Sequence, residues 1–196
     1  GALPNAVDHD MGSIPNLNKR QKMASSSKKS VAIEEVVRSL VSFSFRRDEL
    51  NPILDGLPSD SGVNSVKLEY EFNFLKIISA GWGISFYMTE GDCKKSVSEM
   101  YWNRIYEISR NISSSASTSL GRKLEYFEIL QNRIDVYATA LSALDSDAAD
   151  PGTVIGQNFA RLCGDEKDTH AVMCGQKTFS DSILCVKSYL DSIEIV

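Results

Sequence analysis

Residues 161–179 hold the side chains most able to do chemistry: two cysteines, Cys163 and Cys174, with the histidine His170 between them. If a helix begins near Thr169, His170 and Cys174 stand at positions i and i+4 on one face, a spacing that lets two side chains reach one metal ion. Cys163 would supply a third ligand from the preceding turn. Zinc commonly takes four ligands and no fourth is evident, so we favour the alternative that these cysteines are buried apolar side chains. The sequence therefore gives a candidate metal site at Cys163, His170 and Cys174, with no cofactor expected.

A second candidate site combines an arginine with aromatic residues. Tyr126, Arg133 and Tyr137 are separated by 7 and 4 residues, which places them on one stripe of a helix. An arginine flanked by tyrosines can bind an anionic ligand or the carboxylate of a partner. Trp82 lies between two glycines and could mark a backbone bend against which a ligand packs. The alternative for all four is packing against neighbouring helices, with polar tips at the surface.

Paired carboxylates are the remaining candidates for catalysis. Glu69 and Glu71 flank Tyr70, and Glu125 and Glu128 are three residues apart on an expected helix. Two carboxylates can perform acid–base chemistry when they are buried together, but such residues more often form a solvated face. The sequence has no GxSxG, no HExxH and no phosphate-binding P-loop. These features favour a protein that is not an enzyme.

Composition and charge limit the class of partner. The formal net charge is -5 and the isoelectric point is near 5.1, so a nucleic-acid or anionic-membrane surface is not expected. Four cysteines without a CxxC pair indicate reduced thiols and a cytoplasmic location. The first residues lack the apolar segment of a signal peptide.

The chain divides into a polar arm at residues 1–30, unstructured or left over from expression, and one helical domain at residues 31–196. Ser30 is the expected cap of the first helix, and the serine-rich segment at residues 113–119 is the expected linker between two later helices. The last helix is expected to begin near Asp168 or Thr169, after a stop at Gly164.

Residues 66–89 fit two structures. Alternating apolar residues from Val66 to Phe74 are typical of a strand, whereas Val66, Tyr70, Phe74 and Ile77 also fit one face of a helix. We favour a long helix with a weak point at Gly81 and Gly83, with a short β-hairpin as the alternative.

The sequence therefore predicts an all-α fold, an irregular bundle of about five or six helices. The expected function is a soluble, non-enzymatic protein-interaction module that binds a protein partner or a second copy of itself. The alternative is a bundle that binds a small ligand or a metal.

Overall fold

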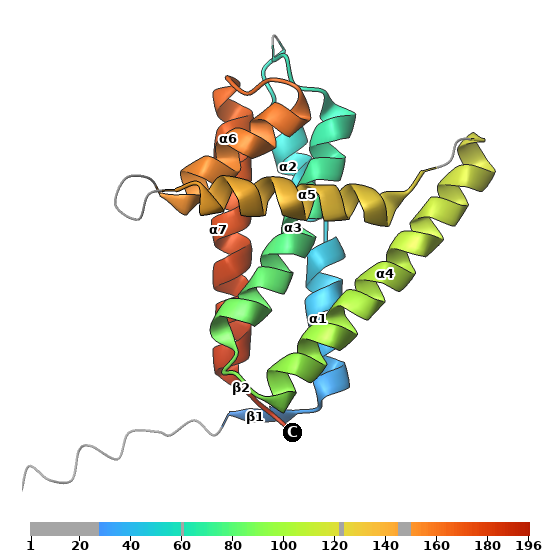
Figure 1. Ribbon diagram of the computed structural model, residues 1–196. Coiled ribbons are helices and arrows are strands. Elements are labelled where there is room, and N and C mark those ends of the chain that lie inside the picture. Colours follow the sequence, from blue (N-terminus) through green and yellow to red (C-terminus); the bar gives the residue numbers. More distant parts are fainter. Residues whose placement is uncertain (1–27, 60, 122–123, 145–149) are drawn as a thin grey trace, which may run out of the picture.

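The computed structural model describes residues 28–59, 61–121, 124–144 and 150–196, and it has seven helices and one pair of short strands within them (Figure 1). Six of the helices have 13 residues or more, so the predicted all-α bundle is confirmed. In chain order the elements are β1 (Lys29–Val31), α1 (Ile33–Phe45), α2 (Leu50–Asp55), α3 (Ser65–Tyr87), α4 (Asp92–Leu120), α5 (Tyr126–Ser142), α6 (Pro151–Cys163), α7 (Thr169–Ser192) and β2 (Ile193–Ile195). None of the described helices is both long and apolar enough to cross a bilayer.

Helix α3 forms the centre of the bundle, with α7 on one side and α1 and α4 on the other, while α5 crosses over it (Figure 1). It is buried on nearly every side, which explains why its apolar residues show no clear helical stripe. The helix interpretation of residues 66–89 is confirmed, and the hairpin alternative is wrong. The expected weak point is also wrong, because α3 runs without a break through Gly81 and Gly83.

These two glycines are contact points between helices. A Cβ added to Gly81 would lie 2.4 Å from the ring atom Cζ2 of Trp102 on α4, and one added to Gly83 would lie 2.7 Å from Cγ1 of Val186 on α7. Glycine at these positions therefore lets α4 and α7 approach α3 closely.

The serine-rich segment is helical, which corrects the predicted linker. Helix α4 continues through residues 113–119 and ends only at Gly121, which has a left-handed backbone with φ of 63°. Ser113 Oγ donates to the carbonyl of Ser109 (2.9 Å), and Thr118 Oγ1 donates to that of Ser114 (3.0 Å). These side chains bond to the helix they belong to instead of interrupting it. The linker prediction failed because serine composition alone does not fix the backbone.

The two ends of the described chain meet in a parallel strand pair that the sequence did not reveal. Lys29 of β1 pairs with Ile193 of β2, and Val31 pairs with Ile195. Ser30 therefore lies in a strand, so its predicted role as a helix cap is wrong, and α1 starts after Ala32. Three residues of the predicted arm, 28–30, belong to the described structure, and the rest of the arm, residues 1–27, lies outside it.

The turn between α6 and α7 follows the prediction. Gly164 ends α6 with φ of 116°, and Asp168 caps α7 by accepting a hydrogen bond from the backbone N–H of Ala171 at 2.8 Å. The two helices are in close contact, since a Cβ on Gly156 would lie 2.4 Å from the carbonyl oxygen of Val172. This contact fixes the position of α7 and so of the residues it carries.

Candidate functional site

The cysteines and the histidine of the predicted metal site do not surround a common point. Cys163 is fully buried at the end of α6, and burial raises the pKa of its thiol far above the usual range. Burial also raises the pKa of Cys174 to about 11, and its sulfur lies 4.0 Å from Thr178 Oγ1. His170 Nε2 lies 3.3 Å from the carbonyl oxygen of Ile53. Among the described residues no three His, Cys, Asp or Glu side chains are arranged to hold a metal ion.

Arg133 does bind a carboxylate, but that carboxylate belongs to the same chain. Its Nε lies 2.9 and 2.8 Å from the two oxygens of Glu71 on α3, and its Nη2 lies 2.7 Å from Oε1. This bidentate pair holds α5 against α3 and raises the pKa of Arg133 above its ordinary value. The Nε–Nη2 edge of the guanidinium, a candidate to bind an external ligand, is therefore occupied by Glu71.

The aromatic residues of the second candidate site lie in the core. Tyr126 packs on Phe74 with ring centroids 4.8 Å apart, and Tyr137 is fully buried. Trp82 lies far along α3 and meets Phe179 of α7 edge to face at 6.2 Å. The structure thus places Tyr126, Arg133 and Tyr137 in one region between α5 and α3, and Trp82 in another.

The four glutamates form no buried pair that could do acid–base chemistry. Glu69 is bound by Arg47, while Glu71 is bound by Arg133. Glu125 and Glu128 lie at the start of α5 beside a shallow hollow between α4 and α5.

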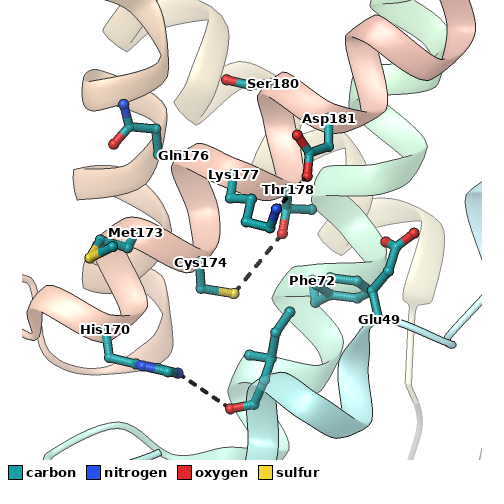
Figure 2. A pocket seen from close by; sticks show the side chains of 11 residues that line it. Glu49, Phe72, His170, Met173, Cys174, Gln176, Lys177, Thr178, Ser180 and Asp181 are labelled. Carbon is teal, nitrogen blue, oxygen red and sulfur yellow. Dashed lines mark hydrogen bonds and ion pairs between the residues drawn. The ribbon is translucent and has the colours of Figure 1, made fainter. Parts of the chain in front are cut away.

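The clearest cavity lies between α2, α3 and α7 and has a volume of about 510 Å³ (Figure 2). We call it the α7 pocket. Its lining residues come from all three helices: Glu49 next to α2, Ile53 on α2, Phe72 on α3, and His170, Met173, Cys174, Gln176, Lys177, Thr178, Ser180 and Asp181 on α7. Figure 2 shows the Cys174 sulfur pointing across the cavity toward Phe72, while the Lys177 ammonium points to Asp181. Most of this surface is apolar, as in pockets that bind apolar groups.

The charged groups around the α7 pocket are already paired. Lys177 Nζ lies 3.0 Å from Asp181 Oδ2 on the same helix. Glu49 lies 3.3 Å from Lys76 Nζ and 3.6 Å from Arg46 Nη2 through its two oxygens. The pocket therefore presents no isolated charge to a ligand.

Lys76 stands behind the pocket wall and is completely buried. Its Nζ donates to the carbonyl oxygen of Arg46 at the end of α1 (2.9 Å) and lies over the ring of Phe43 at 4.7 Å. Burial lowers the pKa of this ammonium, and Glu49 partly offsets that effect. Its contact with Phe72 and Glu49 fixes two of the lining residues.

The sequence singled out two of the lining residues, His170 and Cys174, but as candidate metal ligands. It missed Ile53 and Phe72, because contacts between α2, α3 and α7 are not visible in the order of residues. One signal was present: residues 170, 173, 174, 177, 178 and 181 repeat at helical spacing, which places them along one side of α7.

Comparisons with known protein families, with curated proteins and with solved structures found no match to this chain.

Proposed function

We propose that this chain is a non-enzymatic protein-interaction module whose α7 pocket receives an apolar side chain from a partner. The observation that carries the proposal is the pocket itself, a half-open cavity of about 510 Å³ whose walls include Ile53, Phe72 and Met173. An apolar side chain that enters such a cavity loses its contact with water, which favours binding.

The charges around the pocket support an apolar and uncharged binding group. Lys177 is paired with Asp181, and Glu49 is paired with Lys76 and Arg46. A charged group would have to compete with one of these partners and would lose its own water. A neutral side chain such as leucine has neither cost.

The face of α7 next to the pocket also supports a protein partner. Met173 and Leu184 lie on this face, and 63% and 57% of their surfaces are exposed. They extend the apolar surface of the pocket along the helix, as expected where a partner covers more than one side chain.

The test is a titration with N-acetyl-leucine amide, a neutral probe with one apolar side chain. The methyl NMR signals of Ile53 and Met173 are recorded at each probe concentration. It uses the natural chain and a Leu184→Ser variant. The variant removes the exposed leucine of α7, so that this leucine of another molecule cannot compete with the probe for the pocket. We expect saturable shifts of both methyl signals, at least in the Leu184→Ser variant. An Ile53→Asp variant, followed through the Met173 methyl alone, should show no shift, while the matched control Val66→Asp, an exposed apolar position outside the pocket, should keep the shifts of both methyls. No shift in either chain would contradict the proposal.

A second candidate function uses the same pocket for a small, neutral, largely apolar molecule. Its volume of about 510 Å³ falls in the range common for small-ligand pockets, and this observation favours the candidate. Comparing the native and denatured masses of the purified protein tests it. A reproducible excess that disappears in Ile53→Asp would support a bound molecule, and equal masses would count against one that copurifies.

A further inference from the structure

When the outward face of α7 is read in the reverse direction, apolar residues remain at both ends, but the lysine and the aspartate exchange places. Four residues point to solvent along this face, Met173, Lys177, Asp181 and Leu184, with Ser180 at their edge. We call these five residues the α7 outer stripe. All of them except Leu184 also line the α7 pocket. An apolar residue stands at each end, and a lysine and an aspartate stand between them.

A two-fold axis through the middle of this stripe would bring unlike charges together. Suppose that a second α7 lies antiparallel on the first, with the axis between residues 178 and 179. The numbers of two residues that face each other then add up to about 357. Met173 then lies opposite the partner's Leu184. Lys177 lies opposite the turn that holds the partner's Ser180 and the partner's Asp181. By symmetry every contact occurs twice, as in any two-fold interface.

We propose that the partner of the α7 pocket is a second copy of this chain, bound through the α7 outer stripe in an antiparallel, two-fold arrangement. This inference rests on the proposed function, because it names the partner of the same pocket. The partner's Leu184 reaches the pocket edge at Met173, and the same contact forms on the other copy.

The charge pattern distinguishes this arrangement from a parallel one. In a parallel pair, Lys177 would face the partner's Lys177, and like charges at an interface oppose association. In the antiparallel pair, Lys177 exchanges its contact with Asp181 on its own helix for the partner's Asp181. The exchange conserves the number of ion pairs, so burial of the two apolar ends can drive association.

The first experiment measures native mass by sedimentation equilibrium at several concentrations of the full chain. We expect the natural protein to approach twice its chain mass of 21.7 kDa as concentration rises. Lys177→Asp places two aspartates opposite each other and should weaken association by at least about tenfold. The double variant Lys177→Asp with Asp181→Lys restores opposite charges with the signs reversed, and it should restore association. Circular dichroism checks that each variant keeps its helices.

A cross-linking experiment tests the position of the axis. Ser180→Cys, made in a Cys185→Ser background, puts two thiols about 4 Å apart along the helix direction, so mild oxidation should give a disulfide-linked dimer. The matched control is Ser188→Cys in the same background. It lies on the same exposed face, but its two copies would be about 28 Å apart, so no cross-link is expected.

The outcomes separate this inference from the proposed function. If the natural chain stays at its single mass while N-acetyl-leucine amide still binds the pocket, self-association is overturned and the pocket serves another partner. If the chain dimerises but Lys177→Asp has no effect or Ser180→Cys does not cross-link, the dimer uses another face and the inference fails. If neither the natural chain nor Leu184→Ser binds the probe, the proposed function itself is contradicted.

Discussion

Two ion pairs of this protein each join a basic side chain to a carboxylate, but their surroundings are opposite. Glu71 and Arg133 join α3 to α5 in the interior, with side chains 5% and 21% exposed. Lys177 and Asp181 lie on the outer face of α7, with side chains 80% and 57% exposed. The inner carboxylate receives three hydrogen-bond contacts from its arginine, whereas the outer pair has a single contact at 3.0 Å.

The difference shows what each pair can do. A buried charge that loses its partner remains without water, so the inner pair fixes the position of α5 on α3. An exposed charge that loses its partner is taken up by water at little cost, so the outer pair can exchange partners. The inner pair therefore belongs to the fold, and the outer pair is available for binding.

Removing the inner cation should have the largest effect. Arg133→Met leaves Glu71 buried without a partner and should lower the free energy of unfolding by about 3–5 kcal/mol. Urea denaturation measures the change. The matched control is Arg47→Met, which breaks the exposed pair with Glu69 and should cost less than about 1 kcal/mol. Equal losses in the two variants would show that burial does not distinguish the pairs.

An intermediate effect is expected at Asp168, which caps α7 and accepts a hydrogen bond from Ser61 at 2.7 Å. Asp168→Ala should lower the free energy of unfolding by about 1 kcal/mol, as for other lost caps. Burial alone would raise the pKa of Asp168, but hydrogen bonds from Ala171 and Ser61 outweigh it and hold the pKa below its ordinary value. This stabilisation is present above the pKa of the unfolded chain, and it is lost as pH falls through the lower pKa of the folded chain.

A second substitution isolates the titration. Asp168→Asn keeps a capping oxygen but cannot ionise, so its stability should depend less on acidic pH than that of the natural chain. A series of urea denaturations across acidic pH makes the comparison. Identical pH profiles would show that Asp168 contributes no such linkage.

The smallest effect on stability is expected at the outer pair. Lys177→Ala should leave the melting temperature of the monomer unchanged within error, because water takes the place of the lost ammonium as the partner of the exposed Asp181 carboxylate. The same variant should weaken self-association, which sedimentation equilibrium measures. Lys95→Ala, which breaks the similarly exposed pair with Glu99 on α4, is the control and should change neither quantity.

The helices could be predicted from the sequence where apolar spacing was regular, and the caps of α7 and α6 followed from Asp168 and Gly164. The failures have physical causes. Serine in residues 113–119 can bond to its own helix as readily as it can interrupt one, and the β1–β2 pair depends on contacts between the two ends of the chain.

The candidate site was harder to predict than the fold. Arg133 was a candidate to bind an anionic ligand or the carboxylate of a partner, and only the packing of α5 on α3 shows that it binds Glu71 of its own chain. His170 and Cys174 were candidate metal ligands, with buried apolar cysteines as the favoured alternative, and in the structure they line a cavity with Ile53 and Phe72, which come from other helices. Spacing within one helix can be read from a sequence, whereas contacts between helices cannot.

The parallel pairing of β1 with β2 has a mechanical consequence. The chain enters β1 at one end of the pair and leaves β2 at the other end, so a force that draws these ends apart slides the strands along each other. All the backbone hydrogen bonds of the pair then resist together, instead of opening one at a time. Force applied to the two ends of the chain therefore acts on the β1–β2 pair first, and it reaches the helices only after the two strands separate.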